Sequence, residues 1–289
     1  MIIVRIWEGL GNQLFQYAYA RALQERTGRK VYLDIRHVNR GDLPFEKEDI
    51  VKRKLGLQNF KITLKGVATA KIPSLRCLDG SSQIRKAEYI FMKKGKWIWK
   101  YVDDECRIGQ LCQDIYNPKD DTYVNAHCLN KSYYEDIRRI LLNELKLNKR
   151  IVLNHTLDDM LKSKNVVSIH IRLTDYLRTP KVICSQEYYD QAINYIKERV
   201  PNPCFIVFSD NPHMAKARYH FTGDVYWVEK DEIKDYEALT IMSWCKHNII
   251  AFSTFSYWGA WLNQNAEKIV VASRIWSRGN MYDKDWKLL

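Results

Sequence analysis

The sequence predicts an α/β fold of two domains, and three observations support this prediction. Strand-like and helix-like segments alternate over residues 166–273, and residues 2–35 carry a β-α-β pattern of their own. The chain has 289 residues, nearly twice the roughly 150 residues of a typical domain. We therefore expect residues 1–150 to form an N-terminal α/β domain and residues 151–289 a doubly wound C-terminal one.

The N-terminal β-α-β pattern is compact. Residues 2–6, IIVRI, read as a strand, and the glycine turn WEGLG follows. Residues 12–26 place apolar side chains at helical spacing, and Gly28 lies just past their end; glycine is common there because it accepts the left-handed conformation that ends a helix. Residues 30–35, KVYLDI, read as the second strand, so the two strands should pair in parallel.

The rest of the N-terminal half gives weaker signals. Residues 46–56 look helical, and residues 89–100 suggest a hairpin around a glycine. Residues 132–147 form a strongly amphipathic pattern, with Ser132 and Glu135 at capping-box spacing. We expect a long helix there.

The C-terminal half alternates regularly. Its strands are near-continuous apolar runs, as a sheet covered on both faces requires. The predicted strands are residues 166–171, 204–209, 224–229, 248–252 and 268–273. The predicted helices are residues 155–163, 185–200, 211–220, 235–247 and 255–265. Ser185 is the expected cap of the second helix, and Asn211 followed by Pro212 begins the third.

The charge balance concerns partners rather than fold. With 46 Lys and Arg against 34 Asp and Glu, the net charge is +12, which favours nucleic acid, an acidic membrane surface or a phosphorylated small molecule. The basic residues are spread along the chain and match no nucleic-acid motif, so we expect no nucleic-acid partner.

The cysteine pattern and the hydropathy indicate a cytoplasmic protein. There are seven cysteines and no C-x-x-C pair, which favours reduced thiols and disfavours a zinc site. No apolar run approaches the roughly 20 residues that cross a bilayer, and the N-terminus lacks a signal-peptide core.

Polar clusters follow three of the predicted strands, and a fourth group lies at the glycine turn after residues 2–6. Ligands of open parallel sheets bind beyond the carboxyl ends of the strands, so these clusters are the candidate site. They are His170, Arg172, Thr174 and Asp175; Ser209 and Asp210; Ser253, Thr254 and Ser256; and Gly9, Gly11, Asn12 and Gln13.

Several of these residues have a plainer interpretation. Ser253 or Thr254 either binds a phosphate at a helix N-terminus or merely caps that helix. Arg172 either binds the same anion through its guanidinium or pairs with Asp175. His170 is more often a buried, hydrogen-bonded histidine than a catalytic one.

Two nucleotide-site patterns are incomplete. The glycine turn begins a G-x-G-x-x-G, but Leu14 stands at the third glycine position, although Asp34 lies at the spacing of a ribose-binding acid. The only Asp-x-Asp, Asp283 and Asp285, lies in the tail and reads as solvated charge rather than a metal site.

Three motifs together resemble the alpha-1,2-fucosyltransferases, glycosyltransferase family 11. Residues 9–18 resemble the family's GLGNQLFQYA signature, residues 170–176 its H-x-R-R-x-D motif, and residues 245–258 its C-x-H-N-I…N-S-T-F-S-W-W stretch. The chain departs from the family at Leu173, where the second motif arginine is expected. It departs again at residues 126–129, where AHCL replaces G-Y-F-Q and puts acceptor choice in question.

The resemblance implies a GT-B-like fold with two Rossmann-like domains facing across a cleft. It implies inverting transfer of L-fucose from GDP-fucose to the 2-hydroxyl of a terminal galactose, with no cofactor and no metal. The C-terminal domain would bind the GDP-sugar and the N-terminal domain would lie on the acceptor side. The implied catalytic residues are Arg172 on the diphosphate, His170 and Asp175. The implied donor-binding residues are Gly9, Gly11, Asn12, Gln13, Ser209, Asp210, Ser253, Thr254, Phe255 and Ser256.

The catalytic base, the acceptor and the competing functions stay open on sequence grounds. The candidates for the base are Asp34, His127, His170 and Asp175. The excess positive charge suggests an acidic membrane face, where a lipid-linked glycan acceptor would lie and the enzyme would be peripheral to the inner membrane. The alternatives are another nucleotide-sugar transferase on the same fold, or a non-catalytic protein that binds polyanions or glycans.

Overall fold

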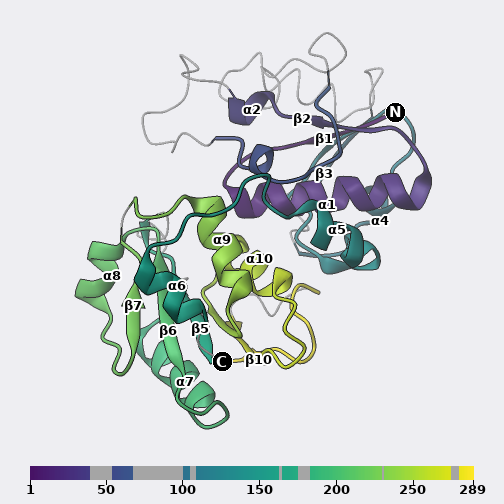
Figure 1. The fold of residues 1–289 in the computed structure, drawn as a ribbon. Helices are drawn as coiled ribbons and strands as arrows, with labels where there is room; N and C mark the ends of the chain where they lie inside the picture. The colour runs from purple at the N-terminus through teal and green to yellow at the C-terminus, as the bar shows by residue number, and fades with distance from the viewer. Residues whose placement is uncertain are drawn as a thin grey trace. The chain divides into compact units, whose positions relative to one another are not determined.

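The computed structural model describes residues 1–39, 54–67, 100–104, 109–162, 165–174, 183–229, 231–274 and 280–289. The chain divides into two compact units. Unit 1 comprises Met1–Lys146 with Gly279–Met281, and unit 2 comprises Leu147–Arg278 with Tyr282–Leu289. Each unit contains one parallel sheet (Figure 1). The predicted α/β class is confirmed, and the predicted boundary at residue 150 lies near this division.

The sheet of unit 1 has four parallel strands in the order β2-β1-β4-β3. They are β1 (Ile2–Arg5), β2 (Val31–Asp34), β3 (Lys100–Asp103) and β4 (Thr122–Asn125). The β-α-β unit of β1 and β2 is confirmed. Strands β3 and β4 were not predicted, because KYVD and TYVN are too short and too polar to stand out as apolar runs.

Helix α1 (Leu10–Thr27) starts earlier than the sequence suggests. Gly9 is its N-cap in an extended conformation, and Asn12 N donates to Gly9 O at 3.0 Å. The predicted glycine turn is therefore wrong at Leu10 and Gly11, which already lie in the first helical turn. Gly28 ends the helix at φ 65°, as expected.

The predicted long helix at residues 132–147 is wrong in its first half. Two 3-10 turns, η4 (Lys131–Tyr133) and η5 (Glu135–Ile137), precede a short α5 (Arg138–Glu144). Tyr134, at φ −147° and ψ 0°, interrupts the helix. Asn130 is the actual cap and accepts from the backbone N–H of the residue two positions on at 3.0 Å, so the expected capping box is also wrong.

The remaining predictions for unit 1 lie largely outside the described residues. Of the predicted helix at 46–56 only residues 54–56 are described, and they are not helical; of the hairpin at 89–100 only residue 100, the start of β3, is described. The other short elements are α2 (Arg36–Asn39), η1 (Leu57–Asn59) and α4 (Gln113–Tyr116).

Unit 2 follows the predicted alternation closely. Its strands are β5 (Val166–Ile171), β6 (Cys204–Ser209), β7 (Val225–Trp227), β8 (His247–Ile250), β9 (Val270–Ala272) and β10 (Lys287–Leu288). Its helices are α6 (His155–Lys162), α7 (Gln186–Lys197), α8 (Pro212–Arg218), α9 (Asp235–Trp244) and α10 (Thr254–Leu262). The caps expected at Ser185 and Asn211 are confirmed, since their side chains accept from backbone N–H groups at 3.2 Å and 3.0 Å. The tail strand β10 was not predicted.

The strand order of unit 2 identifies where a ligand would bind. The order is β10-β9-β8-β5-β6-β7, with parallel pairing throughout. The chain runs outward from β5 to β7 and then returns to the opposite side of β5 with β8. The direction of winding thus reverses between β5 and β8, and the crevice at such a switch point is the usual ligand site of a doubly wound sheet.

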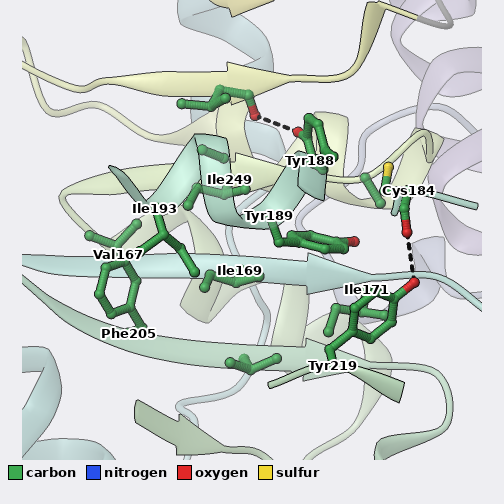
Figure 2. Packing of buried hydrophobic residues seen from close by; sticks show 14 of the residues in the cluster. Val167, Ile169, Ile171, Cys184, Tyr188, Tyr189, Ile193, Phe205, Tyr219 and Ile249 are labelled. Carbon is green, nitrogen blue, oxygen red and sulfur yellow. Dashed lines mark hydrogen bonds between the residues drawn. The ribbon is translucent and has the colours of Figure 1, made fainter. Parts of the chain in front are cut away.

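One face of β5 is buried against α7. Val167, Ile169 and Ile171 alternate toward this face and pack with Tyr189 and Ile193 of the helix (Figure 2). Each fully buried apolar side chain stabilises the fold by about 1.5–3 kcal/mol. Alternation along the strand leaves the next position, 170, facing the opposite side of the sheet.

Candidate active site

The first candidate group gathers around Asp210, which directly follows β6. Its carboxylate accepts from the backbone N–H of Leu173 at 2.9 Å and from that of Thr174 at 3.0 Å. The Thr174 hydroxyl also donates to it. Arg172 Nη1 lies 3.4 Å from the same carboxylate. Asp210 therefore fixes the segment that leaves β5 and holds the arginine at the carboxyl edge of the sheet.

The electrostatics of this group favour the ionised pair. Burial alone would raise the pKa of Asp210, but Arg172 and the hydrogen bonds from Thr174 and Leu173 outweigh it and leave that pKa lowered. The arginine keeps one fifth of its side chain exposed. A guanidinium carries five N–H donors in a planar fork that suits carboxylate and phosphate oxygens.

Asp175, the alternative partner that the sequence suggested for Arg172, lies outside the described residues. Among the described residues, the partner shown for Arg172 is Asp210. Asp210 was expected near a nucleoside, and that role stays a prediction.

His170 lies on the other face of β5 and is only 3% exposed. Its ring packs against Phe255 with centroids 5.5 Å apart. Within the described residues its Nδ1 has no hydrogen-bond partner, so the expectation of a fully hydrogen-bonded histidine is wrong. Burial lowers the pKa of His170 to about 3; the charge of Asp210 opposes this effect, and the charge of Arg172 adds to it. The imidazole is therefore neutral at physiological pH.

The N-terminus of α10 lies beyond β8, across the switch point from His170. Ser253 caps the helix, and its Oγ accepts from the N–H of Phe255 at 3.3 Å, so the capping interpretation is confirmed for this residue. Ser256 is fully buried and its hydroxyl donates to Ala251 O at 3.4 Å. Thr254 and Phe255 are half-buried in the first turn. The helix dipole still favours an anion at this end.

Ser209, at the end of β6, is half-buried, and its Oγ accepts from the N–H of Asn211 at 3.1 Å. The structure thus places Arg172 together with Asp210 and Ser209, where β5 and β6 end. It places His170 next to the start of α10, where β5 and β8 end.

The glycine motif belongs to unit 1. The buried Gln13 amide donates to Glu8 O at 2.8 Å and to Lys54 O at 2.9 Å, and its oxygen accepts from Gly56 N at 2.9 Å. The Asn12 amide donates to the Glu8 carboxylate. In the structure, Gln13 ties neighbouring segments together and Asn12 holds an acidic side chain.

Asp34, a candidate base, is engaged elsewhere. It is 1% exposed and accepts from Arg36 at 2.7 Å and 2.8 Å and from the Tyr123 hydroxyl at 2.7 Å. Burial opposes ionisation, but Arg36 and Tyr123 outweigh it, so the pKa of Asp34 is lowered. These contacts describe a structural carboxylate.

His127, another candidate base, belongs to a cluster that the sequence did not reveal. Its Nδ1 lies 3.3 Å from Asp104, and its Nε2 lies 3.6 Å from Glu8. The three residues follow strands β4, β3 and β1, whose carboxyl ends lie at one edge of the sheet. Since β3 and β4 were not predicted, nothing in the pattern placed these residues together. The carboxylates lie at opposite ring nitrogens, and among the described residues no His, Cys, Asp and Glu cluster suits a metal ion.

The His127 cluster should make stability depend on pH. Burial opposes the charged ring, but Asp104 and Glu8 outweigh it and raise the pKa of His127 to about 9. A raised folded-state pKa means that the stabilisation is complete below the unfolded value of about 6.5 and disappears as the pH rises through about 9. We expect His127→Gln to lower the melting temperature at pH 6 and to differ less from the wild type at pH 10. Thermal unfolding measures this, and a constant difference at both pH values would contradict it.

The Asp-x-Asp motif of the tail lies just before β10. Its Asp285 side chain is exposed and its Asp283 side chain is half-buried.

Within the described part of the chain no helix is long and apolar enough to span a bilayer.

Comparison with known proteins decides the family. Residues 120–287, more than half of the chain, match the model of Glycosyl transferase family 11. The chain belongs to this family. It is therefore a glycosyltransferase, and the match includes β4, the Arg172–Asp210 pair and the start of α10.

Two named relatives match the chain over most of its length, and a third matches less than half of it. An O-antigen biosynthesis glycosyltransferase of Escherichia coli, WbnK, is 29% identical over 96% of this chain and 95% of its own length. An alpha-1,2-colitosyltransferase of the same species is 27% identical over 96% of this chain and 92% of its own length. Galactoside alpha-(1,2)-fucosyltransferase 2 of Sus scrofa is 25% identical over 45% and 42%.

Two solved structures show weak similarity to the chain. The fucosyltransferase NodZ from Bradyrhizobium is 16% identical, covers 89% of this family 11 chain and 91% of its own, and gives a TM-score of 0.47. The E. coli heptosyltransferase WaaC is 10% identical, covers 100% of this chain and 92% of its own, and gives a TM-score of 0.43.

Proposed function

We propose that this family 11 enzyme transfers L-fucose from GDP-fucose to the 2-hydroxyl of a terminal galactose, with inversion at the sugar. The observation that carries the donor half is the Arg172–Asp210 pair beside the switch point of unit 2. The relatives named as alpha-1,2-transferases support the linkage. The motifs that resemble the fucosyltransferases support the donor.

The chemistry of this site suits a departing nucleoside diphosphate. As the bond from the sugar to the β-phosphate breaks, negative charge grows on the phosphate oxygens. Arg172, held in place by Asp210, supplies fixed N–H donors, and the N-terminus of α10 supplies a favourable dipole. Donors that are fixed before the reaction stabilise developing charge without reorganisation. We propose that this electrostatic contribution suffices without a metal ion or other cofactor.

A second candidate function differs only in the donor sugar. The relative named as an alpha-1,2-colitosyltransferase is 27% identical over 96% of the chain, so a nucleotide sugar other than GDP-fucose is the specific alternative. Among the described residues, the side chains proposed to bind the donor lie in unit 2 and suit its phosphates. Both nucleotide sugars carry such phosphates. The choice between them therefore needs a direct comparison of donors.

For the acceptor we propose a galactose-terminated glycan attached to lipid, such as a lipopolysaccharide precursor, met at the cytoplasmic face of the inner membrane. The relative named for O-antigen biosynthesis supports this, and the net charge of +12 would favour an anionic membrane surface. Binding to anionic vesicles that weakens as salt increases is the expected result. Equal binding to neutral vesicles would contradict it.

The central test is an assay of GDP release. We expect GDP-fucose with a β-galactoside to release GDP and form a fucosylated product, at a rate unchanged by EDTA. A donor panel run in parallel gives the preferred sugar, and reactions without acceptor give the background of donor hydrolysis. Loss of activity in EDTA would overturn the metal-independent mechanism. Binding of galactosides with no transfer from any donor would indicate a non-catalytic glycan-binding protein.

A further inference from the structure

Leu173 directly follows Arg172 in the segment that leaves β5 and occupies the position of the expected second motif arginine. The two side chains lie in different surroundings. Arg172 is one fifth exposed and lies 3.4 Å from Asp210, whereas Leu173 is fully buried. The inference drawn from this difference concerns how the donor site is held in place, and it rests on the proposed role of Arg172 at the donor phosphates.

The Leu173 side chain belongs to the apolar core between β5 and α7. It is 0% exposed and lies in the same buried cluster as Ile169 and Ile171 of the strand and Tyr189 of the helix. Figure 2 shows these three neighbours within the cluster. The face of β5 that α7 covers therefore continues beyond the end of the strand to position 173.

A side chain at position 173 thus points into the core and away from the ligand edge. A guanidinium placed among apolar side chains would lose its hydration, and a buried charge without a partner strongly destabilises a fold. A leucine fills the same place with apolar atoms only. In this chain, the second position of the motif is therefore an apolar anchor rather than a second phosphate-binding group.

The backbone of Leu173 is fixed as well. Its N–H donates to one Asp210 oxygen at 2.9 Å, and the N–H of Thr174 donates to the other at 3.0 Å. On the other side of Arg172, Ile171 ends β5, pairs with β6 and is itself fully buried. Arg172 is therefore flanked on both sides by residues whose side chains are held in the core.

We propose that Leu173 is a positioning residue for the donor site. Its buried side chain, together with its N–H bond to Asp210, holds the backbone of Arg172 so that the guanidinium keeps one place at the carboxyl edge of the sheet. Donors that are fixed before the reaction stabilise developing charge without reorganisation. A misplacement of about 1 Å can cost 10²-fold in rate. The site needs no second cation at position 173.

The first test shortens the anchor. We expect Leu173→Ala to lower kcat about 10–100-fold, because Arg172 is no longer held in place, and to weaken the binding of GDP. Leu173→Met keeps the volume of the side chain and should restore most of the turnover. Steady-state kinetics and calorimetry with GDP measure the two effects. Wild-type kcat and GDP affinity in a folded Leu173→Ala protein would overturn the proposal.

The matched control is Ile196→Ala in the last turn of α7. Ile196 is fully buried in the same cluster, and its truncation removes as many carbon atoms as that of Leu173. Both variants should lower the melting temperature by about 5–15 °C. Below that temperature Ile196→Ala should keep wild-type kcat and GDP affinity. Equal losses of kcat in the two variants would show that Leu173 is only structural.

A milder pair gives the same comparison if the alanine variants are too unstable to assay. Leu173→Val and Ile196→Val each remove one carbon atom from the cluster. We expect kcat to fall in the first and to stay at the wild-type level in the second. The opposite order, or no difference between the two, would contradict the positioning role.

Leu173→Arg separates an apolar anchor from a missing cation. We expect this variant to lower the melting temperature at least as much as Leu173→Ala, because a guanidinium enters the core, and to bind GDP no more tightly than the wild type. A Leu173→Arg protein of wild-type stability with tighter GDP binding would place position 173 on the donor side and overturn the proposal.

A double-variant cycle tests the link to Asp210 without any ligand. Effects on stability are not additive within one hydrogen-bonded network, whereas those of separate sites add up. We expect Leu173→Ala and Asp210→Asn together to lower the unfolding free energy by less than the sum of their separate effects. Ile196→Ala combined with Asp210→Asn should be additive. Additive effects in both cycles would contradict a shared role of Leu173 and Asp210.

This proposal and the proposed function fail in different ways. If GDP binds to no form of the protein, the donor assignment is wrong, and the double-variant cycle still decides whether Leu173 holds the segment around Arg172. If the wild type transfers fucose from GDP-fucose and folded Leu173→Ala does so at the same rate, the function stands and the positioning role is wrong.

Discussion

Arg172→Ala should reduce the turnover of sugar transfer about 10²–10³-fold while the protein stays folded. This is the usual loss when one fixed donor to a developing negative charge is removed. The side chain lies at the carboxyl edge of β5, 3.4 Å from Asp210 and one fifth exposed, so its removal leaves no cavity in the core. Arg172→Lys should recover only part of the loss, because an ammonium cannot bind a phosphate through two parallel hydrogen bonds.

Steady-state kinetics with GDP-fucose and a galactoside measure this effect, and thermal unfolding checks the fold. Arg199→Ala is the matched control, because Arg199 is an exposed arginine beyond the end of α7 that pairs with Glu198. It should leave turnover unchanged. Wild-type turnover of Arg172→Ala would remove Arg172 from the mechanism and would favour a purely structural ion pair with Asp210.

Asp210→Asn should lower turnover by about 10²-fold and also weaken the fold of unit 2. The carboxylate accepts from Leu173 N and from Thr174 N, and it holds Arg172 in place. The amide keeps one oxygen but replaces the other acceptor with a donor that faces those N–H groups. Misplacement of a catalytic group by about 1 Å can cost 10²-fold in rate, and loss of hydrogen bonds to a charged group costs about 1.5–3 kcal/mol each.

The pH dependence gives a separate readout of the same pair. Because the folded-state pKa of Asp210 is lowered, its stabilisation is present above the unfolded value near 3.9 and is lost as the pH falls through the folded value. The difference in unfolding free energy between wild type and Asp210→Asn should therefore shrink on acidification below about pH 4. Asp224→Asn, an exposed aspartate just before β7, is the control. A difference that does not shrink as the pH falls below about 4 would contradict this account.

Much of unit 2 could be predicted because each of its signals is local. The runs VVSIHI and CFIVFS are apolar along their whole length, as strands covered on both faces must be. Ser185, Asn211 and Ser253 cap helices in the structure with side chains that accept nearby N–H groups. Patterns of this kind depend on residues within one or two turns of each other.

Unit 1 was less predictable because its signals are weak or non-local. Strands β3 and β4 are four residues each and carry polar side chains, and they are strands because the sheet pairs with them. The long helix expected at residues 132–147 gives way to 3-10 turns, since Tyr133 packs on other rings and its hydroxyl accepts from Cys112 N at 2.8 Å. At these residues tertiary packing overrides the local helix propensity.

The sequence by itself determined the α/β class, the positions of the strand ends in unit 2 and the motif residues of a family 11 glycosyltransferase. Only the tertiary structure decided which of those residues work together. It paired Arg172 with Asp210, which lies 38 positions further along the chain. It also joined Glu8 to His127 and Asp104 across three strands. The physical reason is that parallel strands bring their carboxyl ends to one edge whatever their separation in sequence, and a hydrophobic pattern records burial but not which strands become neighbours.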